Sequence, residues 1–336
     1  MASAQDTSAP AADSIDQARQ FIRANQLEKA NSLLSDLVRK DPSNEPALIE
    51  LGNVQLTQGL NDDALKSFEA VLGNNPGSAP AREGEVKAAA AAALADRRAG
   101  VDGSALLYLI RARKFVPDSP ELLLDFGVQA ESMHIYQDAD SALTKAHELA
   151  PEDAKIRYAL ARVQLDEQKM PDAEANLRAY LKMLPNDATA HYGLGRLLHV
   201  LMRNDEAKAE LERSLALQPR QTASYYELGE IALEQNHENE AKDNYQKTLD
   251  LAPHHGGALT GMGILAFRKK DYQAAEQYLQ GAVFYAADYP RAHHYYALVL
   301  ARLGRQAESK TQSDLATSLD EQQTKTSRGN FLTEIH

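Results

Sequence analysis

The sequence contains no cysteine among its 336 residues. Disulfide bonds, thiolate metal ligands and cysteine nucleophiles are therefore excluded. It also lacks an apolar run of about 18 residues, the length that a helix needs to cross a bilayer. The longest candidate, residues 88–95, is nearly all alanine. This run predicts an ordinary helix.

Basic residues are outnumbered by acidic ones, 36 lysines and arginines against 48 aspartates and glutamates, so the formal net charge is −12 at pH 7. Such a balance argues against a protein that binds nucleic acid or anionic membranes over its whole surface. The sequence has no H-E-x-x-H, G-x-x-x-x-G-K, G-x-S-x-G or calcium-loop motif. Its ten histidines include two adjacent pairs, but neighbours on a helix point about 100° apart. We therefore expect no metal site, no cofactor and no catalytic residue.

The most informative feature that is present is a 34-residue repeat. Prolines recur at this interval at Pro151, Pro185, Pro219 and Pro253. Alanines keep the same interval at Ala139, Ala173, Ala207, Ala241 and Ala275. A fixed period of this length is typical of stacked helical units, none of which buries its apolar face alone.

The prolines occupy position 32 of a unit, which places the unit starts near residues 11, 45, 79, 120, 154, 188, 222, 256 and 290. Position 8 is then mostly glycine or alanine, position 20 mostly alanine, and position 24 large and apolar. Apolar residues recur at helical spacing over two segments in each unit. The pattern predicts two helices per unit, brought close together by the small residues.

This pattern resembles the tetratricopeptide repeat (TPR) family over residues 11–320. The unit that begins at Thr222 carries the resemblance best, with Tyr225, Leu228, Gly229, Ala232, Ala241, Tyr245 and Pro253. The resemblance implies an all-α fold, an α-solenoid wound as a right-handed superhelix of about nine units. It also implies that the first helix of each unit lines a concave groove.

Four segments depart from the regular array. We expect a disordered head at residues 1–10 and a polar tail at 321–336, in which Phe331, Leu332 and Ile335 either dock or stay loose. The interval from Pro76 to Pro117 is seven residues too long. Because glycines punctuate residues 97–104, an inserted loop is expected there. In the last unit Ser309 and Ser313 replace apolar residues, which is typical of a polar terminal cap.

Two glycine pairs have the spacing of phosphate-loop fragments. They are Gly193 with Gly195 and Gly261 with Gly263. Both pairs fall at positions 6 and 8 of a unit and follow no predicted strand. We therefore interpret them as packing glycines.

The TPR resemblance places positions 2, 5, 9, 12 and 13 of each first helix on the groove. The peptide-binding residues expected there are Tyr158, Arg162, Tyr192, Arg196, Tyr226, Glu230, Phe267, Arg268, His294 and Arg302. Over nine units these positions hold nine basic residues and six acidic ones. This local excess of positive charge in an acidic chain predicts an acidic peptide partner. The alternative is that Arg162 simply pairs with Asp166 on its own helix.

These features predict a non-catalytic protein-interaction scaffold or adaptor that binds a partner peptide or helix. Self-assembly through the repeat ends, or a role as the regulatory module of an enzyme complex, are the alternatives. The compartment is left open. Ala2, Ser3 and Ala4 fit either a coincidence in an alanine-rich head or the remnant of an export signal. The first implies a soluble cytoplasmic protein and the second a bacterial periplasmic one.

Overall fold

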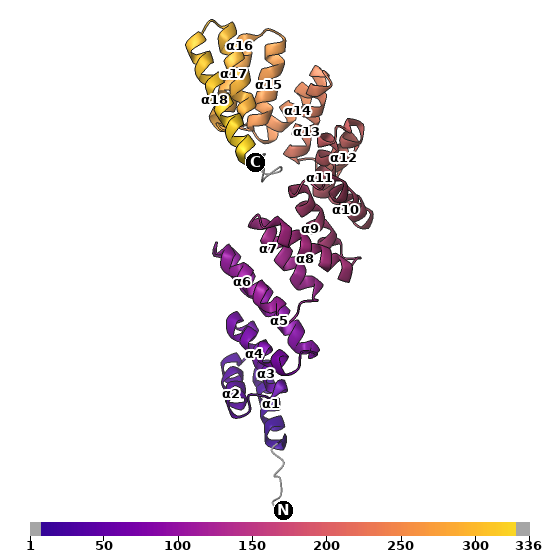
Figure 1. Cartoon of the computed structure of the whole chain (residues 1–336), viewed down its shortest axis with the longest axis vertical. Coiled ribbons are helices and arrows are strands. Elements are labelled where there is room, and N and C mark those ends of the chain that lie inside the picture. Colours follow the sequence, from indigo (N-terminus) through magenta and orange to yellow (C-terminus); the bar gives the residue numbers. More distant parts are fainter. Residues whose placement is uncertain (1–7, 327–336) are drawn as a thin grey trace, which may run out of the picture. The chain divides into compact units, whose positions relative to one another are not determined.

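The computed structural model describes residues 8–326, which form eighteen α-helices and no strand. Within each of two compact units, divided between Val163 and Gln164, consecutive helices pack as pairs (Figure 1). Each pair corresponds to one repeat of the sequence, 34 residues long except in the third repeat. The described chain is therefore an all-α solenoid. No helix in this range is long and apolar enough to cross a membrane.

The first helix of most repeats has 13 residues. These helices are α1 (Ser8–Arg23), α3 (Glu45–Thr57), α5 (Ala79–Arg98), α7 (Pro120–Ser132), α9 (Ala154–Asp166), α11 (Ala188–Val200), α13 (Thr222–Glu234), α15 (Gly256–Arg268) and α17 (Pro290–Arg302). From α3 onward, each begins at the residue where the repeat spacing places a unit start. The repeat period is thus set by the lengths of two helices and two turns.

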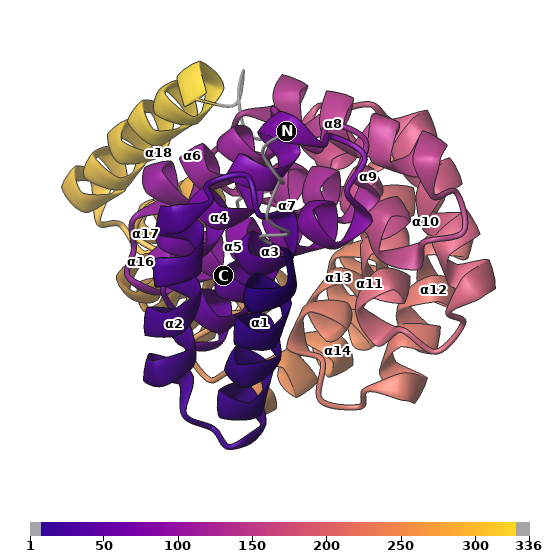
Figure 2. The same ribbon diagram turned by 90° about the horizontal axis from the view of Figure 1, so that it is seen from below.

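The second helix of each repeat mostly has 14 residues. These helices are α2 (Leu27–Lys40), α4 (Asn61–Asn74), α6 (Asp102–Arg113), α8 (Tyr136–Leu149), α10 (Met170–Met183), α12 (Asn204–Leu217), α14 (Glu238–Leu251), α16 (Tyr272–Tyr285) and α18 (Gln306–Thr326). Figure 2 shows α1 and α2 lying side by side, joined by a tight turn.

One residue in the turn between the two helices of every repeat has a left-handed backbone. These residues are Asn25, Gly59, Gly100, His134, Gln168, Met202, Asn236, Lys270 and Gly304, with φ between 55° and 83°. The conformation ends the first helix and reverses the chain, as glycine commonly does at this position. For a residue with a Cβ atom, the left-handed conformation costs about 1 kcal/mol.

Met202→Gly is therefore expected to raise the free energy of unfolding by about 1 kcal/mol. The Met202 side chain is 71% exposed, so its loss removes little packing. Urea denaturation followed by circular dichroism measures the change. Gly304→Ala is the matched control at φ 83°, and it should be destabilising by a similar amount. If neither Met202→Gly nor Gly304→Ala differs from the wild-type chain in its free energy of unfolding, the turn is not strained.

Close packing within a repeat depends on the small residue at position 8. A Cβ atom on Gly229 would lie 2.6 Å from the Tyr245 ring, and one on Gly195 would lie 2.8 Å from Leu211. Tyr245 and Leu211 occupy position 24 and are fully buried. The two helices of a repeat therefore approach closely because the large residue fills the space of the missing side chain.

The extra seven residues of the third repeat lie in a helix and not in the expected loop at 97–104. α5 has 20 residues, and only Ala99 to Val101 separate it from α6, which contains Gly103. Seven residues complete about two helical turns, so the added length preserves the buried face of the helix. Alanine, which dominates residues 88–95, has the highest helix propensity. Gly100 then ends the helix at φ 74°.

The array extends slightly further at both ends than the sequence pattern predicts. α1 begins at Ser8, inside the expected head, and α18 continues to Thr326, inside the expected tail. Residues 1–7 and 327–336, including Phe331, Leu332 and Ile335, lie outside the described range. In the last repeat the Ser309 hydroxyl donates a hydrogen bond to the Ala297 carbonyl at 2.8 Å. This polar contact stands where other repeats have alanine.

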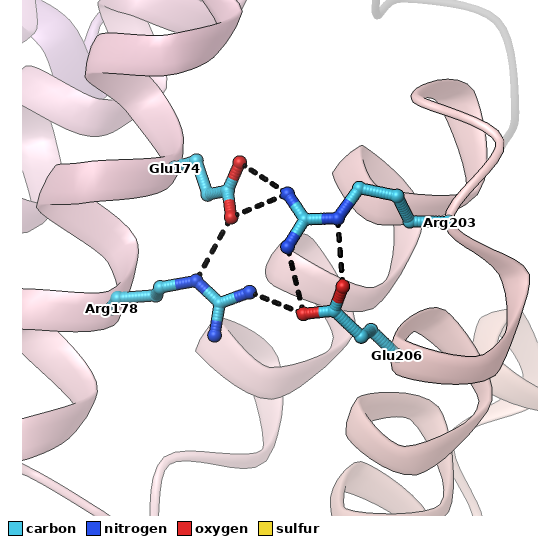
Figure 3. A network of polar contacts seen from close by, with 4 residues as sticks. All are labelled: Glu174, Arg178, Arg203 and Glu206. Atoms are coloured by element: carbon cyan, nitrogen blue, oxygen red, sulfur yellow. Dashed lines mark hydrogen bonds and ion pairs between the residues drawn. The ribbon is translucent and has the colours of Figure 1, made fainter.

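Ion pairs link the second helix of one repeat to the next repeat. Arg203 donates hydrogen bonds to both carboxylate oxygens of Glu174 at 2.8 Å and to those of Glu206 at 2.7 and 2.8 Å. Arg178 donates to the same two carboxylates at 2.9 and 2.8 Å (Figure 3). Three repeats later, Arg305 bonds Glu276 and Glu308 from the corresponding positions. The first network pairs two arginines with two glutamates, whereas the second has one arginine for two glutamates. Both connect neighbouring repeats, but such partly exposed pairs contribute little stability each.

Candidate functional site

The candidate site is the exposed face of the first helices, defined by positions 2, 5, 9, 12 and 13 of each repeat. In the unit that ends at Val163, this face carries Tyr158 and Arg162 on α9. Tyr158 is half-buried. Arg162 is 49% exposed and forms an ion pair at 2.7 Å with Glu131, whose side chain is 6% exposed. Arg162 therefore links α9 to α7.

In the other unit, α11 and α13 carry a second cluster of paired charges. The Arg196 Nε atom lies 3.6 Å from Glu227, and the His199 Nδ1 atom lies 2.9 Å from the same carboxylate. His199 Nε2 also lies 3.2 Å from Glu234. Burial alone would lower the pKa of His199, but its hydrogen bonds to the two carboxylates outweigh burial and raise it. Tyr192, half-buried beside Arg196, has its pKa raised by burial.

Tyr226 and Glu230 do not present exposed groups to a ligand, in contrast to the expectation from the sequence. Tyr226 is 5% exposed, and its ring centroid lies 4.7 Å from that of His255. Glu230, 8% exposed, accepts a hydrogen bond from the Tyr245 hydroxyl at 2.5 Å and pairs with Arg291 of α17. Burial raises the pKa of Tyr226 well above its usual value. Both residues therefore belong to a buried polar cluster.

The remaining predicted residues lie together on α15 and α17. Arg268, His294 and Arg302 are exposed, and Phe267 is half-buried. The Phe267 ring packs on Tyr295 with centroids 6.3 Å apart, and Tyr295 in turn contacts His294 at 5.4 Å. We call this the α15–α17 surface, and its members are Phe267, Arg268, His294, Tyr295, Leu298 and Arg302.

Most basic residues on the first-helix face are ion-paired in the described range, but the two arginines of the α15–α17 surface are not. Of the nine basic residues at these positions, five are ion-paired with carboxylates: Arg19, Lys87, Arg162, Arg196 and Arg291. Arg268 instead donates to the Leu233 carbonyl and the Asn236 side chain. Within residues 8–326, neither Arg268 nor Arg302 has a carboxylate partner.

Two important residues were missed from the sequence. Leu298 is 38% exposed between His294 and Arg302 on the same face of α17. It occupies position 9, and a survey of apolar as well as charged residues at groove positions would have found it. Glu227 lies at position 6, outside the five groove positions. Its pairing with Arg196 and His199 could not be read from the repeat.

His255 and His293 have structural roles, and Gly195, Gly261 and Gly263 are packing glycines as expected, whereas a Cβ atom on Gly193 would meet no neighbour within 4 Å. His255 Nδ1 accepts the backbone N–H of Ala258 at the start of α15, and His293 is buried against Gln312. Both glycine pairs lie inside α11 and α15. No group of three or more His, Cys, Asp or Glu side chains suited to a metal ion occurs in the range 8–326.

Comparison with known proteins agrees with this architecture. One tetratricopeptide repeat profile matches residues 15–79, 158–207 and 201–254, and a second matches residues 232–303. No curated protein sequence matches the chain. Two of the solved structures that the chain resembles illustrate the fold. One is that of Pseudomonas aeruginosa pilF, which is 21% identical over 63% of this chain and 93% of its own, with a TM-score of 0.51.

The second is the hetero-tetramer Cut9–Hcn1 of APC/C, 16% identical, with a TM-score of 0.57. The match covers 89% of this chain but 57% of that one. At these identities the likeness establishes the fold alone. The fold, the repeat profiles over more than half of the chain and the small-to-large packing at positions 8 and 24 agree. The chain belongs to the tetratricopeptide repeat family.

Proposed function

We propose that this protein is a non-catalytic scaffold that binds an acidic segment of a partner protein on the α15–α17 surface. TPR arrays are in general protein-interaction modules. The observation that carries the proposal is the pair of exposed arginines, Arg268 and Arg302, without carboxylate partners in the described range. Five of the other seven basic residues at these positions are already paired with carboxylates.

The chemistry of the surface favours a carboxylate-bearing chain. A guanidinium binds a carboxylate through two parallel hydrogen bonds, so each arginine can fix one acidic side chain. Leu298 and the Phe267–Tyr295 pair supply apolar area beside these charges. Rigid aromatic and apolar contacts add affinity, while the charges steer and orient the ligand. Tyr192 with Arg196, and Tyr158 with Arg162, remain further candidate contacts in their own units.

The double variant Arg268→Glu/Arg302→Glu is expected to weaken binding of an acidic peptide at least tenfold. The loss follows because two attractive charges become repulsive. The probe is a fluorescein-labelled synthetic peptide of about 12 residues in which glutamates alternate with leucines, and its twin carries glutamine for glutamate. Fluorescence polarisation measures both affinities. The wild-type chain should prefer the glutamate peptide.

The matched control is Arg220→Glu/Lys310→Glu, which makes the same change in net charge at exposed positions elsewhere in the unit. It should leave the affinity within about twofold of wild type. Circular dichroism and melting temperature establish that both variants are folded. Equal losses in the two double variants would mean that overall charge, and not the α15–α17 surface, governs binding. That result would overturn the proposal.

A further inference from the structure

A second surface lies on the third repeat, far in sequence from the α15–α17 surface. Exposed large apolar side chains are concentrated between the end of α5 and the middle of α6. They are Leu94, Val101, Leu107 and Ile110, and Leu107 is 64% exposed. This is also the repeat whose first helix is seven residues longer than its counterparts. An apolar strip of this kind on a helix surface commonly marks a protein contact.

The strip leads into a small pocket of about 210 Å³ with a cationic rim. Its lining residues are Ile110, Arg113, Lys114, Pro117 and Lys145. The Lys145 ammonium donates to the Pro117 carbonyl at 2.9 Å, and the Arg113 guanidinium lies 4.0 Å from the Phe126 ring centroid. In the described range, none of the three cations forms an ion pair with a carboxylate.

Two carboxylates lie near these cations, but neither is among the residues that line the pocket. Burial lowers the pKa of Arg113, and the nearby carboxylate of Asp138 partly opposes that shift. Lys145 is close enough to Asp118 to help lower the pKa of that carboxyl. Asp118 is itself held in an ion pair by Arg82. The three cations on the rim therefore keep a local positive excess in a chain whose net charge is −12.

The spacing of the exposed residues defines the shape of a partner. Gly103, Leu107, Ile110 and Lys114 follow one another at intervals of three or four residues, so they share one face of α6. We propose that this face binds an amphipathic helix of another protein, antiparallel to α6, with the acidic first turn of that helix at the pocket. Its apolar residues pack on Leu107 and Ile110.

The antiparallel orientation follows from electrostatics. Helix first turns are commonly acidic because the helix dipole stabilises negative charge there. An antiparallel partner brings such a turn to the end of α6, where Arg113, Lys114 and Lys145 lie. The opposite orientation would place a second carboxyl-terminal helix end beside that of α6. Charge complementarity therefore selects both the partner type and its direction.

The cysteine-free chain permits a sharp test, because Gly103→Cys provides a single attachment site for an environment-sensitive fluorophore. A Cβ atom at Gly103 meets no neighbour within 4 Å. The probe is a synthetic helical peptide of about 16 residues with three glutamates in its first turn and leucines at i, i+3 and i+7. Its twin has lysines in place of the glutamates. The labelled protein should bind the glutamate peptide at least tenfold more tightly.

Lys114→Glu/Lys145→Glu in the labelled chain should reverse this preference, whereas Lys29→Glu/Lys40→Glu, at exposed positions elsewhere in the unit, should keep it. Vesicles with about 30% phosphatidylserine form a third arm, because an apolar strip beside cations is also how proteins meet anionic lipid. A label that responds to vesicles and to neither peptide would overturn the proposal. So would equal affinity for the two peptides, or a preference that the double variant leaves unchanged.

Discussion

Glu85→Met is expected to raise the free energy of unfolding of the unit formed by residues 8–163 by about 2–4 kcal/mol at pH 8. Glu85 is fully buried in α5, and neither of its carboxylate oxygens has a hydrogen-bond partner. Burial, reinforced by the charge of Glu69 and opposed by Arg111, raises the pKa of Glu85 to about 8. Methionine has the same unbranched length and no polar atom to desolvate.

The same carboxyl group predicts how stability depends on pH. In the folded protein Glu85 keeps its proton up to about pH 8, whereas the unfolded chain loses it near the ordinary value of 4.5. Between these values the folded state binds more protons, so stability falls as pH rises, by at most about 1.4 kcal/mol per pH unit. Below pH 4.5 Glu85 is protonated in both states and costs the folded state nothing by ionising. Above pH 8 it is ionised in both states, and the full loss of stability is reached.

Urea denaturation between pH 4.5 and 9, followed by circular dichroism, measures this slope, and hydrogen exchange of the α5 amides localises it. Glu85→Gln is the matched control because it removes the titration but leaves a buried polar group. It should flatten the pH dependence while gaining less stability than Glu85→Met. If both variants keep the wild-type slope over this range, Glu85 is ionised and paired in the folded chain, and the account of this residue is wrong.

Gly84→Ala is expected to lower the free energy of unfolding by about 1–3 kcal/mol. A Cβ atom at this position would lie 2.3 Å from the ring of Phe68, which is fully buried between Gly52 and Gly84. The ring has no free space into which it can move, so the helix or the ring must shift. Thermal and urea denaturation report the loss.

A second substitution and a matched glycine separate this clash from ordinary helix effects. Phe68→Leu shortens the side chain, so the double variant should be more stable than the sum of the single changes predicts. Gly193 also occupies position 6 of its repeat, but a Cβ atom there would meet nothing within 4 Å. Gly193→Ala should therefore be stabilising by about 0.5–1 kcal/mol. Loss of stability at both glycines would refute the packing explanation.

The helix pairs could be predicted from the sequence because the repeat period records helix and turn lengths. Eight of the first helices begin where the 34-residue spacing places them. The added length in the third repeat was expected as a loop, since glycines near residue 100 resemble loop residues. The structure places it in α5 because seven residues complete two turns and the alanine run favours helix.

The candidate site was only partly predictable, since position in a repeat does not determine burial or pairing. Tyr192 and Tyr226 both occupy position 5, yet only Tyr226 is buried. The difference lies in the following repeat, where Gly257 leaves the space that the Tyr226 ring fills. The excess of basic residues on the first-helix face was likewise counted from positions in the repeat, without regard to which charges pair. Arg291 and Glu230, 61 residues apart, cancel each other through a contact that periodicity does not reveal.

The most direct test of the proposed function is to locate a bound acidic peptide on the chain. The glutamate–leucine peptide described above, carrying a photoreactive residue at its centre, is irradiated with the full-length protein, and the crosslinked fragments are identified by mass spectrometry. We expect crosslinks on α15, between Gly256 and Arg268, and on α17, between Pro290 and Arg302, that disappear in Arg268→Glu/Arg302→Glu. Crosslinks confined to second helices such as α16 and α18, or unchanged in that variant, would contradict the assignment of the binding surface.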